Sequence, residues 1–177
     1  MLQEKPPWLP ILKSHERDFL EAAYKYPALR LKESLLIKEH AHAAIDVSDG
    51  LLADLQHIFI ASNLQAHLRL EKIPFSDPVL KIIEWVQENK GEDIRPSLVT
   101  SGDDYELLFT LSPDATEEVE HLFKKSHFSL GHIGYLADPI YNKDIGKINV
   151  LDEEGKILSF SSLGLTIEAQ TPEEAIQ

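Results

Sequence analysis

Cysteine is absent from the 177 residues, which excludes a disulfide framework and any thiolate metal site. Basic side chains are scarce: 17 lysines and arginines stand against 30 aspartates and glutamates, a formal net charge of −13. Because binding to nucleic-acid phosphate needs clustered lysine and arginine, we do not expect this chain to bind nucleic acid. No apolar run approaches the roughly 20 residues that span a bilayer, so we expect no membrane segment. We expect a cytoplasmic protein.

Two familiar catalytic motifs are missing as well. The chain has no Gly-x-x-x-x-Gly-Lys loop, so it is not a P-loop kinase, and it has no Gly-x-Ser-x-Gly nucleophile elbow. The eight histidines form no credible set of zinc ligands, because a zinc site usually needs three or four ligands together. Carboxylates are the remaining candidates for chemistry, and two clusters of them stand out.

The first cluster is the run IDVSDG at 45–50, where an apolar strand gives way to an amphipathic helix. Free backbone N–H groups and the positive end of the helix dipole meet at such a corner, which attracts phosphate. Asp46 and Asp49 add hard carboxylate ligands, which suit magnesium carried by a nucleotide. The alternative is purely structural, since Ser48 and Asp49 are also good helix starters.

The second cluster is TSGDDYE at 100–106, just before a predicted strand. Three carboxylates in four residues repel one another, so the arrangement costs free energy unless something positive satisfies it. Gly102 lets the backbone turn sharply or approach a ligand closely. The alternative is a solvated loop whose Asp and Gly serve as turn residues. A functional role requires that the two clusters converge in space as a common site for divalent cations and polyphosphate.

Residue periodicity predicts helices and strands in alternation. The predicted helices span 15–25, 28–40, 49–62, 77–89 and 112–125, and the predicted strands span 41–47, 66–71, 105–111, 128–136, 147–151 and 156–160. The last two strands form a hairpin. We therefore expect an α/β fold of α+β character, with a mixed β-sheet and helices mainly on one face.

The chain divides into three predicted regions. Residues 1–25 form an N-terminal arm and a helix, 26–167 form the main domain, and 168–177 form a disordered tail. The arm is rich in proline, which disfavours a regular helix. We expect it either to pack against another domain or to form a short ordered arm, through the apolar residues Trp8, Leu9, Ile11 and Leu12. In the first helix, one face carries Phe19, Leu20, Ala23 and Tyr24.

Together the two clusters resemble the C-terminal domain of thiamine-monophosphate kinase. The resemblance runs from about residue 26 to about 134 and is carried by AIDVSDGLLADL at 44–55, AHLRL at 66–70, IPFS at 73–76 and SGDDYELLFT at 101–110. This family is related to aminoimidazole-ribonucleotide synthetase, selenophosphate synthetase and a hydrogenase-maturation protein. The resemblance implies the C-terminal domain of that fold, with ATP bound in a cleft between it and an N-terminal domain.

The resemblance further implies transfer of a phosphoryl group from ATP to thiamine monophosphate, giving thiamine diphosphate by direct in-line transfer. Asp46 and Asp49 match magnesium ligands, and Ser48 matches a contact to the nucleotide phosphates. Asp103 stands where the family has Glu in its Gly-Gly-Glu-Asp-Tyr-Glu motif, a position that binds the thiamine substrate. It retains the charge but is one methylene shorter. No residue matches a catalytic base.

The family's N-terminal domain, with its own metal-binding aspartates and the main dimer contact, matches nothing in this chain. We therefore expect an excised piece, a cleaved fragment or one half of a split protein, inactive by itself. Its expected partners are thiamine monophosphate, the N-terminal domain and, in the full-length enzyme, a second copy. Gly164–Leu165 stands where the family has a Gly–aromatic pair near the substrate. Two alternatives stay open: another ATP-dependent enzyme of the superfamily, or a non-catalytic remnant that binds a partner subunit.

Overall fold

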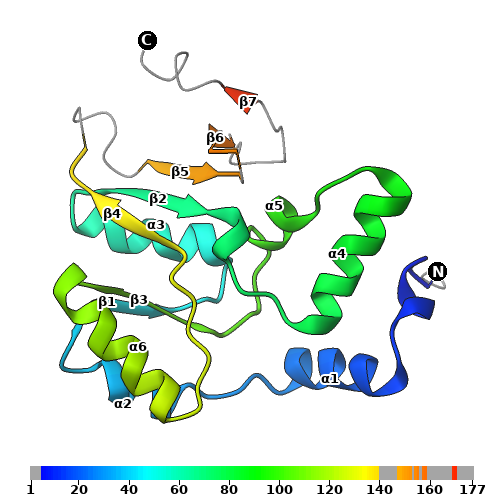
Figure 1. Ribbon diagram of the computed structural model, residues 1–177, viewed down its shortest axis with the longest axis horizontal. Coiled ribbons are helices and arrows are strands. Elements are labelled where there is room, and N and C mark those ends of the chain that lie inside the picture. Colours follow the sequence, from blue (N-terminus) through cyan, green and yellow to red (C-terminus); the bar gives the residue numbers. More distant parts are fainter. Residues whose placement is uncertain (1–4, 140–146, 153, 156, 159–168, 171–177) are drawn as a thin grey trace.

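The computed structural model describes residues 5–139, 147–152, 154–155, 157–158 and 169–170. The helices are α1 (Ser14–Lys25), α2 (Leu31–Ile37), α3 (Leu51–Ala61), α4 (Asp77–Lys90), α5 (Arg95–Leu98) and α6 (Thr116–Lys125), with 3-10 turns at η1 (Leu9–Ile11), η2 (Leu70–Lys72) and η3 (Pro113–Ala115). The strands are β1 (Ala41–Asp46), β2 (Gln65–Arg69), β3 (Leu107–Leu111), β4 (Gly134–Ala137), β5 (Ile148–Leu151), β6 (Ile157–Leu158) and β7 (Ala169–Gln170) (Figure 1).

The strands form two sheets. Strand β1 pairs antiparallel with β3, while the other sheet has the order β4-β2-β5-β6-β7. In the latter, β2 and β5 are parallel and the remaining pairs are antiparallel. The predicted mixed α/β architecture is therefore confirmed. The strand that leads into IDVSDG, however, belongs to the small sheet rather than to the edge of the large one.

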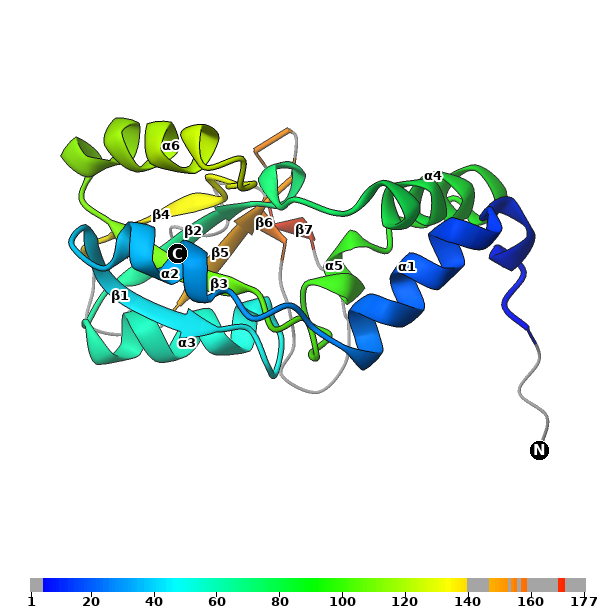
Figure 2. The same cartoon turned by 90° about the horizontal axis from the view of Figure 1, so that it is seen from below.

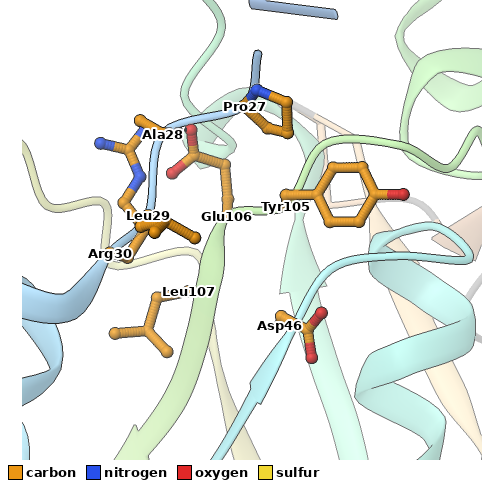
Figure 3. A pocket seen from close by; sticks show the side chains of 8 residues that line it. All are labelled: Pro27, Ala28, Leu29, Arg30, Asp46, Tyr105, Glu106 and Leu107. Atoms are coloured by element: carbon orange, nitrogen blue, oxygen red, sulfur yellow. Dashed lines mark hydrogen bonds and ion pairs between the residues drawn. The ribbon is translucent and has the colours of Figure 1, made fainter. Parts of the chain in front are cut away.

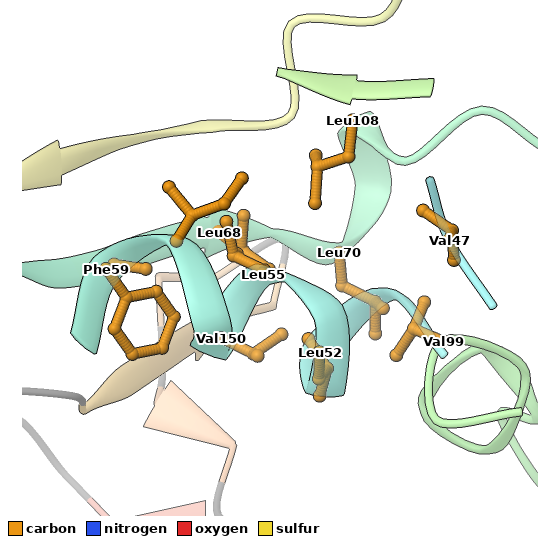
Figure 4. Packing of buried hydrophobic residues seen from close by; sticks show 11 residues of the cluster. Val47, Leu52, Leu55, Phe59, Leu68, Leu70, Val99, Leu108 and Val150 are labelled. Carbon is orange, nitrogen blue, oxygen red and sulfur yellow. The ribbon is translucent and has the colours of Figure 1, made fainter. Parts of the chain in front are cut away.

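Helix α3 carries the main core, because its buried side chains pack against both sheets. Phe59 is fully buried, and its neighbours on the helix meet Leu68 and Val150 of the large sheet and Leu108 of β3 (Figure 4). Val47 and Val99, each 3% exposed, belong to the same cluster. Val47 lies inside the first acidic motif and Val99 immediately precedes the second, so the core anchors both.

The small sheet is covered on both faces. Along β3, Leu108 faces the main core, whereas Leu107, Phe109 and Leu111 pack into a second cluster with residues of α2 and α6. This alternation is the period of two expected for a strand. The sheet thus has α3 on one face and α2 and α6 on the other, where sequence periodicity predicted helices mainly on one face. The predicted fully buried strand at 41–47 is also only half-buried, with His42 and Ala44 exposed.

The N-terminal arm packs onto α4. Leu12 is 2% exposed and lies with Trp8 and Ile11 against Ile82 and Val86. Figures 1 and 2 both show α1 and α4 side by side at one end of the molecule. The arm is therefore an ordered part of the fold.

The apolar face predicted for α1 is mostly not buried. Leu20 packs toward α4, but Phe19 and Tyr24 are 51% and 70% exposed. Exposed apolar side chains continue through the following segment and α2. We call this set the apolar strip; its members are 51–82% exposed and comprise Phe19, Tyr24, Tyr26, Leu29, Leu31 and Leu35. Figure 2 shows α1, this segment and α2 as one continuous path.

Smaller differences concern the end of the chain. The strand predicted over 128–136 is limited to β4, and the β5–β6 hairpin forms as predicted. Within the predicted tail 168–177, β7 pairs with β6, so these two residues are not a free end. The rest of that tail and Gly164–Leu165 lie outside the described residues. None of the helices in the described ranges has both the length and the apolar character that crossing a bilayer requires.

An ion pair joins α1 to α4 and makes a pH-dependent contribution to stability. Lys81 and the backbone N–H of Lys13 donate hydrogen bonds to the buried Glu16 carboxylate, and Lys81 is the main cause of a pKa held below the usual 4.5. Because the folded pKa lies below the unfolded one, this contribution is present above pH 4.5 and is lost as the pH falls through the folded value.

We expect Glu16→Gln to lower the free energy of unfolding at about pH 7 and to have a smaller effect at about pH 3. Urea unfolding at the two pH values measures this difference. The control is Glu21→Gln, which removes an exposed pair with Lys25 within α1 and should matter less. An equal loss at both pH values would contradict this account.

Candidate functional site

The two acidic loops, residues 46–50 and 101–106, lie side by side at one end of the small sheet. The β1–β3 ladder ends with Asp46 opposite Leu107. Beyond it, three backbone N–H to carbonyl bonds continue the pairing: Val47 to Glu106 at 2.9 Å, Tyr105 to Val47 at 2.7 Å and Asp103 to Ser48 at 2.9 Å. The predicted convergence of the two motifs is therefore confirmed, and it rests on main-chain geometry.

Two glycines allow this close approach. A Cβ added to Gly102 would lie 2.4 Å from the carbonyl oxygen of Ser48. A Cβ added to Gly50 would lie 2.9 Å from the carbonyl oxygen of Thr100, and Gly50 also has a φ of 118°. Each glycine thus faces the backbone of the opposite loop, at distances that no side chain could occupy.

The carboxylates of both loops gather around one phenol. Asp46, Asp49 and Asp103 are exposed, and the Tyr105 hydroxyl donates a hydrogen bond to Asp103 Oδ1 at 3.2 Å. That bond and the charge of Asp103 raise the pKa of Tyr105, and the charges of Asp46 and Asp49 raise it further. The metal and substrate residues predicted from sequence are therefore close enough to act on the same group.

The second loop holds a strained backbone. Asp103 and Tyr105 have φ values of 71° and 52°, a region that non-glycine residues rarely adopt. Such strain persists only where the surroundings fix it, and it concentrates at functional sites. Between them, Asp104 has a raised pKa, first because its carboxyl is partly desolvated and then because Glu106 and Asp103 are nearby.

Arg30 is a cation of this site that sequence analysis missed. Its guanidinium pairs with Glu106 of the second loop and, at 3.3 Å, with Glu33 of α2. The Glu106 carboxylate is the main cause of a raised Arg30 pKa. Arg30 therefore balances one carboxylate of the cluster and ties the segment between α1 and α2 to the acidic loops.

A cavity of about 180 Å³ opens beside these groups. Figure 3 shows Asp46 and Tyr105 on one side of it and Arg30 and Glu106 on the other. The remaining lining is apolar and comes from Pro27, Ala28, Leu29 and Leu107. The arrangement offers a hydrophobic wall next to a strongly acidic edge.

Two backbone N–H groups of the first loop, those of Ser48 and Asp49, are not free to bind phosphate, contrary to the prediction. Asp54, in the first turn of α3, accepts hydrogen bonds at Oδ2 from the N–H groups of Ser48 at 2.7 Å and Asp49 at 3.0 Å. The Leu52 N–H is also used, donating to the Val99 carbonyl at 3.3 Å. The acidic residue early in the helix was a sequence signal for this contact. Ser48, half-buried beside Asp49, retains its hydroxyl as a polar group.

The residues fit magnesium only as a shared site. In the described part of the chain, no group of three or more His, Cys, Asp or Glu side chains has an arrangement that could hold a metal ion. Magnesium, however, is often held by one or two carboxylates together with substrate phosphates and water. Asp46 and Asp49 match that mode, in which the nucleotide supplies the remaining ligands.

Comparison with known proteins places these loops in a family. Residues 9–139 match the family model described as AIR synthase related protein, C-terminal domain. The chain belongs to this family. The two acidic loops and the core that anchors them lie within the matched range.

The similar curated proteins are thiamine-monophosphate kinases. The chain is 32% identical over 142 residues to that of Buchnera aphidicola subsp. Acyrthosiphon pisum, covering 80% of this chain and 41% of the relative. It is 32% identical over 126 residues to that of Escherichia coli K12, covering 71% of this chain and 35% of the relative. The chain thus spans about two fifths of the length of these relatives.

Solved structures agree with this family. Thiamine-monophosphate kinase from Stenotrophomonas maltophilia superposes with a TM-score of 0.64 at 33% identity, covering 78% of this chain and 40% of that one. AaThiL complexed with AMPPCP and TMP has a TM-score of 0.60 at 23% identity, covering 90% and 42%. At that identity the second structure supports the fold alone.

Replacing Gly102 should separate the two loops. Because a Cβ there meets the Ser48 carbonyl at 2.4 Å, Gly102→Ala should destabilise the protein by about 1–3 kcal/mol and expose the amides of Asp103 and Tyr105 to exchange. Hydrogen exchange followed by NMR measures this effect.

The control is Gly91→Ala, at the left-handed end of α4, where nothing lies within 4 Å of the added Cβ. It should cost about 1 kcal/mol through backbone strain and leave the loop amides protected. Unchanged protection of both amides in Gly102→Ala would show that the close contact is not needed.

Proposed function

We propose that this chain is the C-terminal part of an ATP-dependent thiamine-monophosphate kinase, which phosphorylates thiamine monophosphate to thiamine diphosphate. The observation that carries the proposal is the gathering of Asp46, Asp49 and Asp103 around Tyr105 by two loops locked together through their backbones. Family membership and relatives named as this kinase support the substrate and reaction.

In this proposal Asp46 and Asp49 hold magnesium against the phosphates of ATP, and the Ser48 hydroxyl contacts a phosphate oxygen. Bound magnesium neutralises phosphate charge, which is the main requirement of phosphoryl transfer besides positioning. The acceptor is itself an anionic phosphate oxygen, so in-line transfer needs no general base from this chain. Asp103, oriented by Tyr105, faces the cationic thiamine portion.

The remaining part of the active site comes from a domain outside this chain. The chain spans only 41% and 35% of the two curated kinases compared above. The apolar strip, whose Leu29 also lines the cavity, is a surface of the kind that marks a protein interface. We infer that an N-terminal domain docks along this strip, closes the nucleotide site and makes the isolated chain inactive without it. A second copy joins through that domain in the full-length enzyme.

The test of the kinase uses the chain joined to, or mixed with, the N-terminal domain of such an enzyme. Asp46→Asn and Asp49→Asn should each lower turnover of thiamine monophosphate by about 100-fold or more, because each removes a charged ligand from the phosphate-bound metal. Asp114→Asn, an exposed aspartate in η3, is the matched control and should leave turnover unchanged.

Near-normal turnover in both variants would refute the metal role. Turnover of another phosphate acceptor of the superfamily, with no thiamine monophosphate activity, would favour the alternative enzyme. Activity of the 177-residue chain alone would refute the need for a second domain.

Docking of the N-terminal domain along the apolar strip can be tested by placing a charge on the strip. Leu29→Asp and Leu35→Asp, at positions 82% and 64% exposed, should each weaken binding of the N-terminal domain by about tenfold or more, because burying an unpaired carboxylate is costly. Isothermal titration calorimetry measures the affinity. Ile60→Asp, on α3 and 51% exposed, lies outside the strip and serves as the control. If the two strip variants bound the N-terminal domain as tightly as Ile60→Asp and the wild type do, the interface would lie elsewhere.

A further inference from the structure

We propose that Asp54 is a positioning residue that makes the first acidic loop selective for a cation, so that phosphate binds there only through a metal. This inference rests on the proposed function and deepens it. It concerns a buried carboxylate to which the proposed mechanism gives no role. The effect of Asp54 on ligand choice follows from what it bonds.

Asp54 closes the loop from two sides. It is 3% exposed, and its Oδ2 accepts the N–H groups of both Ser48 and Asp49. Its own N–H donates to the Gly50 carbonyl at 3.0 Å. Residues 48–50 are therefore held against the start of α3 by one side chain and one main-chain bond.

This arrangement opposes anion binding in the turn that precedes α3. Free N–H groups at such a corner attract anions because nothing else satisfies them. Here a resident carboxylate satisfies the N–H groups of Ser48 and Asp49, which precede the helix, so an incoming phosphate would find those two donors occupied and would meet three negative charges, from Asp54, Asp46 and Asp49. Like charges at short range disfavour such binding.

The same bonds determine which side chains remain available. With the Ser48 and Asp49 peptide groups tied inward to Asp54, the Asp49 carboxylate is exposed and Asp46, at the end of β1, is exposed as well. Hard carboxylate oxygens of this kind bind magnesium or manganese. The loop thus presents ligands for a cation and withholds the N–H groups of Ser48 and Asp49 from an anion.

The experiment follows the backbone amide NMR signals of Ser48 and Asp49 in the 177-residue chain, using Mn²⁺ alone and inorganic phosphate with a chelator as separate probes. In the wild type, Mn²⁺ should broaden both signals and metal-free phosphate should leave them in place. In Asp54→Ala, the freed N–H groups should respond to phosphate, and the Mn²⁺ concentration that gives half broadening should rise about tenfold or more.

Two further variants separate positioning from general destabilisation. Asp54→Asn keeps an acceptor oxygen of the same shape and should restore most of the wild-type behaviour toward both probes. Asp77→Ala removes the exposed first-turn aspartate of α4 and should change neither response. A loss of stability alone would not create a response to phosphate. If Asp54→Ala does not fold, hydrogen exchange at the two amides in Asp54→Asn provides the test. Because a neutral amide oxygen accepts a weaker hydrogen bond than a carboxylate, exchange should be moderately faster at these two amides and unchanged elsewhere.

The proposal is overturned if metal-free phosphate already shifts the wild-type amides, or if Asp54→Ala matches the wild type toward both probes. In the Asp54→Asn fallback, exchange at the two amides unchanged from the wild type also overturns it. A wild type that shows no Mn²⁺ broadening would instead overturn cation binding by this loop without nucleotide, and would leave the shared site of the proposed function standing. In that case the phosphate response of Asp54→Ala still decides the role of Asp54.

Discussion

The candidate site depends on the contact between two backbone loops that are more than fifty residues apart in sequence. Gly50 and Gly102 each lie against the main chain of the opposite loop, and three backbone hydrogen bonds extend the β1–β3 pairing between them. The repulsion of so many carboxylates opposes this contact. It is held by two buried valines, Val47 on the first loop and Val99 just before the second, which belong to the largest hydrophobic cluster described. Apolar burial thus supports an acidic surface that would not assemble by itself.

Charge around the site is divided by function. Glu106 is paired with Arg30, and Asp54 accepts hydrogen bonds from two backbone N–H groups, so both carboxylates have partners within the fold. Asp46 and Asp49 are exposed and have no such contact to a cation in the described residues. The carboxylates that have a charged or N–H partner within the fold are therefore distinct from the exposed pair Asp46 and Asp49. The exposed ones are the pair that a nucleotide-bound metal would use.

Much of the fold follows from local sequence patterns, because helices and strands are specified over short ranges. The positions of α3, α4 and the β5–β6 hairpin agree with periodicity, and Gly91 ends α4 in the left-handed conformation that is common at helix C-termini. The sequence pattern did not predict burial correctly where burial depends on residues distant in the sequence. Phe19 and Tyr24 lie on an apolar face that no described element covers, and the proline-rich arm is ordered only because α4 lies beside it.

For the site, the acidic residues were found from sequence but their surroundings were not. The pairing of Arg30 with Glu106 joins positions 76 residues apart, and no local spacing reports such a contact. The strand-to-helix corner suggested free N–H groups; an acidic residue early in the helix indicated a capping side chain, but not that Asp54 bonds the N–H groups of Ser48 and Asp49. Tyr105 belongs to a recognised motif, but its place among three carboxylates is a property of the folded chain.

The segment from Pro27 to Arg30 belongs to two surfaces at once. It forms a wall of the cavity beside Asp46, and Leu29 within it is 82% exposed as part of the apolar strip. A ligand in the cavity and a protein on the strip would each restrict the same short piece of backbone. If the ligand binds first, it removes conformational entropy from this segment, and the protein then has less entropy to remove. The same holds in the reverse order, so the two binding events would be coupled with equal strength in either direction. In the proposed function, this wall would be a point at which binding of a second domain and binding of a ligand affect each other.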